Sequence, residues 1–217
     1  MKPPPYIKEQ AADRERALAM FDVSRETVGR LDAYVELLNT WQATTNLIAP
    51  STLSAMWTRH IADSLQILEF APGAQNWVDF GSGGGFPGVV IACTLKAPAL
   101  VHLVESNGKK AAFLREAARV TGSPARIHNL RVEDFIQQFQ GPVDIVTARA
   151  LAPLPELLGF AAPLVRIGAQ ALLLKGQDVA GELTQAAKYW KIEADLKPSK
   201  TDPKGRIMVV RSLERIT

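Results

Sequence analysis

The sequence is poor in the residues that build disulfide-bonded, metal-binding and membrane-spanning proteins. It has one cysteine, Cys93, among 217 residues, so neither an intramolecular disulfide nor a four-cysteine zinc site can form. No apolar run approaches the roughly 20 residues that a membrane span requires. The N-terminus, Met-Lys-Pro-Pro-Pro-Tyr, lacks the apolar core of a signal peptide. We therefore expect a reduced, cytoplasmic protein that binds no metal and spans no membrane.

What the chain does contain is the composition of an ordinary globular protein, with 47% apolar and 22% charged residues. This excludes a disordered or collagen-like chain. Residues 1–70 carry seven basic and nine acidic side chains, whereas residues 71–217 carry 18 and 13. The basic excess lies in residues 105–131 and 188–217. Segregated basicity fits a phosphate-rich partner, and a solvated basic surface would give the same pattern.

Residues 6–70 have the pattern of a helical segment. Ser24 is a suitable N-cap, and the following apolar residues recur at three- and four-residue steps, which predicts one buried helix face. These residues are Val28, Leu31, Val35, Leu38 and Trp41. Ala71-Pro72-Gly73 interrupts the pattern. We expect a helical N-terminal extension over residues 1–70 and a second domain over residues 71–217.

From residue 76 onward, short apolar strands alternate with helical patterns, which predicts a parallel sheet covered by helices on both faces. The last two strands are joined by a short turn and therefore form an antiparallel hairpin. Such an ending distinguishes a methyltransferase-type sheet from a plain dinucleotide-binding one. The expected strands cover residues 77–80, 100–104, 126–130, 143–147, 171–174, 192–196 and 207–211.

A glycine loop follows the first expected strand, with five glycines in the eight residues 81–88. Glycine permits positive φ and close approach of a ligand to the backbone. A ligand here would sit at the carboxyl end of the strand, near the switch point of the sheet. Asp79, Gly81 and Gly83 are therefore candidate cofactor contacts. The pattern G-x-G-x-x-G also occurs, so nicotinamide binding stays open, as does a tight turn without a ligand.

The ends of the second and third strands supply further candidates. Glu105 lies 24 residues after Gly81, where a carboxylate can accept hydrogen bonds from both hydroxyls of an adenosine ribose. Its neighbour Ser106 belongs to the same candidate site. After the third strand, Val132 could pack on an adenine ring while Glu133 binds its edge. Alternatively, Glu133 only stabilises a helix N-terminus. Enzymes that use NAD and those that use S-adenosylmethionine share these features.

The segment after the fourth expected strand reads Thr147-Ala148-Arg149-Ala150. Methyltransferases that act on exocyclic amines often carry an Asn/Asp-Pro-Pro-aromatic motif here, and its absence argues against that reaction. Arg149 is a candidate contact to a cofactor or a phosphate, with a positioning role in catalysis, or else part of a structural ion pair. No other residue is predicted to be catalytic.

Taken in this order, the motifs resemble those of the bacterial 16S ribosomal RNA N7-guanine methyltransferases, the family once called glucose-inhibited division protein B. The resemblance runs from about Val28 to Arg211. Two departures are mild: family loops often have Thr or Ala at the position of Ser82, and often Asp at that of Glu105. The most specific matching segments are residues 41–47, 59–64, 81–88, 105–115, 131–133, 149–150 and 174–176.

The resemblance implies a Rossmann-like class I methyltransferase with a seven-stranded, mostly parallel α/β sheet. It implies S-adenosylmethionine contacts at Gly81, Phe86, Glu105, Val132, Glu133 and Arg149. The partner would be 16S ribosomal RNA or a small-subunit precursor, methylated at N7 of one guanine in the decoding region. We expect a monomer. The candidate RNA contacts are Arg59, His60, Lys109, Lys110, Arg115, Lys175, Lys204 and Arg206.

Two other functions compete with this interpretation. A nicotinamide-dependent oxidoreductase is disfavoured by the terminal hairpin and by the absence of a second catalytic domain. A non-catalytic RNA-binding protein that retained the fold is disfavoured by the intact glycine loop and Glu105.

Overall fold

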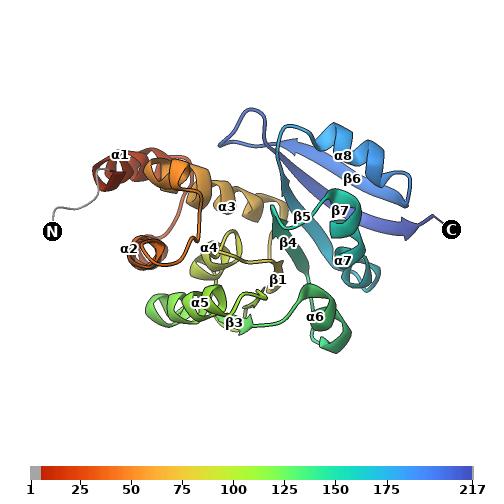
Figure 1. Cartoon of the computed structure of the whole chain (residues 1–217), viewed down its shortest axis with the longest axis horizontal. Helices are drawn as coiled ribbons and strands as arrows, with labels where there is room; N and C mark the ends of the chain where they lie inside the picture. The colour runs from red at the N-terminus through yellow and green to blue at the C-terminus, as the bar shows by residue number, and fades with distance from the viewer. Residues whose placement is uncertain (1–5, 217) are drawn as a thin grey trace.

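Seven strands form one mixed sheet in the order β3-β2-β1-β4-β5-β7-β6 (Figure 1). The computed structural model describes residues 6–216. Five strands are parallel and β7 runs antiparallel to both β5 and β6, as the hairpin prediction required. The strands are β1 (Asn76–Phe80), β2 (Leu100–Val104), β3 (Ala125–His128), β4 (Ile145–Arg149), β5 (Gln170–Lys175), β6 (Trp190–Pro198) and β7 (Arg206–Arg215).

Helices cover both faces of this sheet because its central strands are apolar on both sides. One face packs against α4 (Gly88–Thr94), α5 (Gly108–Thr121) and the N-terminal helices. The other packs against α6 (Val132–Gln138), α7 (Leu154–Arg166) and α8 (Val179–Ala186). The two sets of helices lie on opposite sides of the sheet in Figure 1. The predicted α/β fold is confirmed.

The N-terminal segment forms α1 (Tyr6–Leu18) and α2 (Arg25–Gln42), followed by a run of short helical turns over residues 50–70. Ser24 caps α2 as predicted, because its hydroxyl accepts a hydrogen bond from the Thr27 amide at 3.1 Å. Leu31 and Leu38 of α2 belong to the same hydrophobic core as Val90 of α4. The division of the chain near residue 70 stays a prediction about its organisation, and the two parts share one core.

The fourth strand begins two residues later than predicted. One Asp144 side-chain oxygen accepts hydrogen bonds from the backbone amides of Gln75 and Asn76, at 2.8 and 2.7 Å. This places Asp144 before the strand, which starts at Ile145. Arg149 therefore ends β4 rather than lying in the loop after it.

Membrane-spanning and metal-binding features are not found in the part of the chain that the structure describes. Within residues 6–216, no helix is both long and apolar enough to cross a membrane. Over the same range, no three His, Cys, Asp or Glu side chains gather in a group that could hold a metal ion.

Candidate functional site

The glycine loop between β1 and α4 opens onto a cleft at the carboxyl ends of β1, β2 and β4. Gly81 and Gly83 have φ of +64° and +56°, the left-handed region that favours glycine. A Cβ atom on Gly83 would meet only the Gly81 carbonyl oxygen, at 3.6 Å, so the space beside Gly83 is open to a ligand. We call this space the strand-end cleft. It is lined by Gly81, Gly83, Val104, Glu105, Ser106, Lys110, Leu130, Val132, Ala150 and Leu151.

Two glycines of the loop are required by packing against the N-terminal segment. A Cβ atom on Gly84 would lie 2.9 Å from the carbonyl oxygen of Leu47, and one on Gly85 would lie 2.7 Å from the Tyr34 hydroxyl. That hydroxyl donates a hydrogen bond to the Gly84 carbonyl oxygen. The N-terminal segment therefore packs against the glycine loop and hydrogen-bonds to it. The sequence analysis did not predict this contact.

Glu105 fastens the other side of the loop. One of its carboxylate oxygens accepts a hydrogen bond from the Gly83 amide at 2.9 Å, and the other accepts one from the Asn107 amide at 2.7 Å. The residue is only 8% exposed, and it lines the strand-end cleft. An ionised carboxylate has about four acceptor sites. Glu105 can therefore also accept hydrogen bonds from a ribose while it holds the loop.

The predicted cofactor contacts separate into two groups in the structure. Gly81, Gly83, Glu105, Ser106 and Val132 come together around the strand-end cleft. The other predicted contacts lie outside this lining. Glu133 is exposed in the first turn of α6, Phe86 is 4% exposed beneath the Arg149 guanidinium, and Asp79 is fully buried.

Asp79, a predicted cofactor contact, has a side chain that is fully buried beneath the loop, away from the lining of the strand-end cleft. Its carboxylate accepts hydrogen bonds from the Gly88 amide at 3.2 Å and from the Thr147 hydroxyl at 2.8 Å. Burial raises the pKa of this carboxyl group from 3.8 to about 6, and these hydrogen bonds act in the opposite direction. Asp79 therefore joins β1, β4 and α4 beneath the loop and does not face the ligand.

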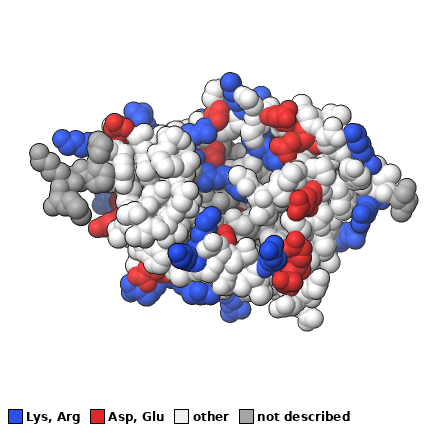
Figure 2. All heavy atoms as spheres, viewed as in Figure 1, with Lys and Arg blue, Asp and Glu red and all other residues white. Residues whose placement is uncertain are grey.

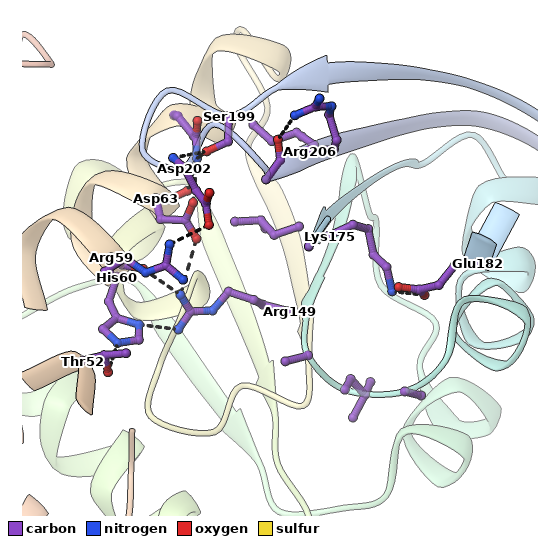
Figure 3. A pocket seen from close by; sticks show the side chains of 18 of the residues that line it. Thr52, Arg59, His60, Asp63, Arg149, Lys175, Glu182, Ser199, Asp202 and Arg206 are labelled. Carbon is purple, nitrogen blue, oxygen red and sulfur yellow. Dashed lines mark hydrogen bonds and ion pairs between the residues drawn. The ribbon is translucent and has the colours of Figure 1, made fainter. Parts of the chain in front are cut away.

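A second cavity, of about 620 Å³, adjoins the strand-end cleft (Figure 3). We call it the charged cavity. The two spaces share Ala150 and Leu151. Ala150 has φ of +52°, a strained conformation for a residue with a side chain, and such strain is common at functional sites. The charged side chains lining the cavity are Arg59, Asp63, Arg149, Lys175, Glu182, Asp202 and Arg206, and the His60 ring lies among them.

Arg149 is held by residues of the N-terminal segment. Its guanidinium donates to His60 Nδ1 at 2.9 Å and to the Arg59 carbonyl oxygen at 3.3 Å, and it lies 5.0 Å from the centre of the Phe86 ring. Because Arg149 donates to Nδ1, the neutral His60 ring carries its proton on Nε2, which lies 2.8 Å from the Thr52 hydroxyl.

His60, a predicted RNA contact, would therefore meet a phosphate as a neutral ring and not as a cation. Burial, with the neighbouring Arg149 and Arg59 charges, lowers the pKa of His60 from 6.5 to about 3. The ring is neutral near neutral pH. Its role in the structure is to orient Arg149.

The turn between β6 and β7 closes one rim of the charged cavity. Arg59 forms an ion pair with Asp202 at 2.7 Å, and the Thr201 hydroxyl donates to Asp63 at 2.8 Å. Gln66 accepts a hydrogen bond from the Lys200 amide at 2.8 Å. Of these residues, sequence reasoning singled out Arg59 as a candidate RNA contact, and Asp63 lies in the matching segment 59–64.

The predicted RNA-binding cations lie in different surroundings. Lys109, Lys110 and Arg115 belong to α5, whereas Lys204 and Arg206 line a shallow groove beside the charged cavity. Lys and Arg side chains gather at the edge of a hollow on the face shown in Figure 2. The predicted contact Lys175 has a side chain that is only 10% exposed, and its ammonium pairs with Glu182.

The sheet order, the terminal hairpin and the cleft with its glycine loop and Glu105 define a class I methyltransferase that uses S-adenosylmethionine. Solved structures agree on the fold. An O-methyltransferase of Bacillus cereus in complex with SAH has a TM-score of 0.59 at 14% identity and covers 94% of this chain and 99% of its own. The O-methyltransferase TomG of Streptomyces achromogenes, in complex with SAM, has a TM-score of 0.54 at 12% identity, over 97% and 100%.

Sequence comparison assigns the family. Residues 28–204 match the family model GidB, described as rRNA small subunit methyltransferase G. Ribosomal RNA small subunit methyltransferase G of Bradyrhizobium sp. (strain ORS 278) is 60% identical over 95% of this chain and 94% of its own length. The protein of that name from Rhodopseudomonas palustris (strain BisB18) is 58% identical over 98% and 90%. The chain belongs to this family of ribosomal RNA methyltransferases, which confirms the resemblance and decides against the nicotinamide alternative.

Proposed function

We propose that this protein transfers the methyl group of S-adenosylmethionine to N7 of one guanine in 16S ribosomal RNA. The observation that carries the proposal is that the strand-end cleft and the charged cavity adjoin each other. The strand-end cleft has the features of a nucleoside-binding cleft, and the charged cavity meets it at Ala150 and Leu151. A target base in the cavity would therefore lie beside a methyl group presented from the cleft. The family shows ribosomal RNA as the substrate class, and it supports the small subunit as the partner.

The residues of the strand-end cleft fit the cofactor. Glu105 would accept the ribose hydroxyls, Val132 would pack against the adenine, and the open space at Gly83 would let the cofactor approach the backbone. Arg149, at the boundary with the charged cavity, has donor groups suited to a carboxylate. When bound, S-adenosylmethionine supplies an electrophilic methyl group on a sulfonium.

We further propose that transfer needs no general base. Guanine N7 has a free lone pair at neutral pH and loses no proton when it attacks the methyl carbon. The chain has only to exclude water and align nitrogen, methyl carbon and sulfur in one line. The cavity residues support transfer without a general base. Asp63, Glu182 and Asp202 each form an ion pair with a cationic side chain, and His60 accepts a hydrogen bond from Arg149.

The test is to map modified guanines at single-base resolution in 16S ribosomal RNA from cells with and without the protein. We expect one N7-methylguanine to depend on it. Small subunits rebuilt with 7-deazaguanine at that position should bind the protein but accept no methyl group. Methylation of the 7-deaza substrate would show that N7 is not the acceptor. A single-turnover rate that rises log-linearly with pH between about 6.5 and 9 would show base catalysis.

A further inference from the structure

Lys175 and Glu182 form a partly buried ion pair in the wall of the charged cavity. Lys175 ends β5 and its side chain is 10% exposed, while Glu182 comes from α8 and is 28% exposed. Figure 3 shows the two side chains meeting on the side of the cavity away from His60. A buried ion pair adds little to stability over apolar residues of similar size. The presence of this pair in a cavity wall therefore calls for a function.

Both members of the pair can form further hydrogen bonds with a ligand. The Glu182 oxygen Oε2 forms the ion pair with the Lys175 ammonium and accepts a hydrogen bond from the Leu154 amide at 3.1 Å. Among residues 6–216, Oε1 has no hydrogen-bond partner, and no side-chain oxygen or nitrogen is both buried and unpartnered. Oε1 is therefore accessible to a ligand. The Lys175 ammonium has three N–H groups, and within residues 6–216 its ion-pair partner is Glu182.

This arrangement matches one purine and opposes the other. The Watson–Crick edge of guanine presents the acceptor O6 beside the donors N1–H and N2–H₂. Adenine presents a donor amino group beside the acceptor N1. An ammonium next to a carboxylate oxygen is therefore complementary to guanine and places like groups against adenine. Guanine N7 is not part of this edge, so the base can be held while N7 stays free. Enzymes that act on an extruded base often read it in this way.

We propose that Lys175 and Glu182 select the guanine. Lys175 donates to O6, and Glu182 Oε1 accepts from N1–H and N2–H₂. The inference rests on the proposed function, since it takes the charged cavity as the acceptor site. It assigns specificity to a pair that the sequence suggested only in part, through Lys175, and as a phosphate contact.

The experiment compares guanosine with inosine at the mapped position in rebuilt small subunits. Inosine lacks only the N2 amino group and keeps O6, N1–H and N7. The wild-type protein should methylate inosine at least about tenfold more slowly at limiting protein, and its S-adenosylhomocysteine complex should bind those subunits correspondingly more weakly. In Glu182→Gln, the methylation rate and the binding affinity for guanosine subunits should both fall. The ratio of the rates for guanosine and inosine should approach one.

Controls separate the possible failures. Glu156→Gln changes an exposed carboxylate of α7 outside the cavity and should keep the full preference. S-adenosylhomocysteine binding and the melting temperature report whether Glu182→Gln retains its fold. Equal methylation of guanosine and inosine by the wild-type protein would overturn the selection proposal whatever the variant does. No methylation of the guanosine subunits would instead overturn the proposed function.

Discussion

The Tyr34 hydroxyl reaches across from α2 and donates a hydrogen bond to the backbone carbonyl oxygen of Gly84, in the middle of the glycine loop. The tyrosine ring is fully buried against Phe86, with 5.4 Å between ring centres. A residue outside the predicted methyltransferase domain thus fixes the loop that borders the strand-end cleft. The N-terminal helices therefore support the glycine loop from the side opposite Glu105.

Tyr34→Phe should weaken both the fold and cofactor binding. The variant keeps the ring but leaves the Gly84 carbonyl oxygen without this partner, which costs about 1–3 kcal/mol of the free energy of unfolding. Urea denaturation would measure that loss, and calorimetric titration with S-adenosylhomocysteine would measure the affinity. Tyr189→Phe, at a 56% exposed side chain, is the matched control and should stay within about 0.5 kcal/mol of wild type. An unchanged Tyr34→Phe protein would show that the loop holds its shape unaided.

Glu105→Ala should lower the affinity for S-adenosylhomocysteine at least about tenfold, because hydrogen bonds to a charged group contribute roughly 1.5–3 kcal/mol. The loss has two sources: the ribose acceptor disappears, and the Gly83 amide loses its partner. Glu105→Gln keeps one acceptor oxygen and should fall between the alanine variant and wild type. Equal affinities for all three proteins would remove Glu105 from the binding site.

Replacing Lys204 and Arg206 together by alanine should flatten the salt dependence of RNA binding. If each cation neutralises one phosphate, the slope of log affinity against log salt should fall by roughly 1.5. Arg166 and Lys188, which are exposed and line neither the cleft nor the cavity, make the control pair. Filter binding over a salt series measures the slopes. The same slope in both double variants would mean that the groove beside the charged cavity does not meet RNA.

Asp79 should make the wild-type protein less stable as pH rises from about 4 to about 6. Its pKa is 3.8 unfolded and about 6 folded, so within this window the folded state binds the proton and the unfolded state does not. Relative to Asp79→Asn, the free energy of unfolding should fall by about 3 kcal/mol across the window and then level off. Denaturation of both proteins at each pH measures the difference, with Asp134→Asn as an exposed control. A difference that rises with pH would contradict the assigned burial.

The parallel sheet and its terminal hairpin could be predicted because alternation and the glycine loop are local signals. Glu105, Ser106 and Val132 could be placed together for a related reason: neighbouring parallel strands bring their carboxyl ends to one edge. The start of β4 was wrong by two residues because it depends on Asp144 meeting amides nearly 70 positions away.

The residues whose surroundings the sequence did not reveal are those with partners far away in the chain. Asp79 could not be known to meet Thr147, nor His60 to meet Arg149, since each pair joins different elements. The abundance of glycine was read as a ligand-binding signal. In the structure Gly84 and Gly85 instead make room for Leu47 and Tyr34, so a glycine-rich loop reports protein packing as well as ligand approach.

Because the turn between β6 and β7 lines only the charged cavity, the residues of the two spaces are synthesised over different parts of the chain. All residues lining the strand-end cleft lie between positions 81 and 151, whereas the lining of the charged cavity extends from position 52 to position 207. All residues that line the strand-end cleft therefore leave the ribosome before Asp202, which forms the rim of the charged cavity with Arg59. On the proposed function, we therefore expect a chain that stops before the final hairpin to lack the rim of the base-binding cavity and to transfer no methyl group to RNA.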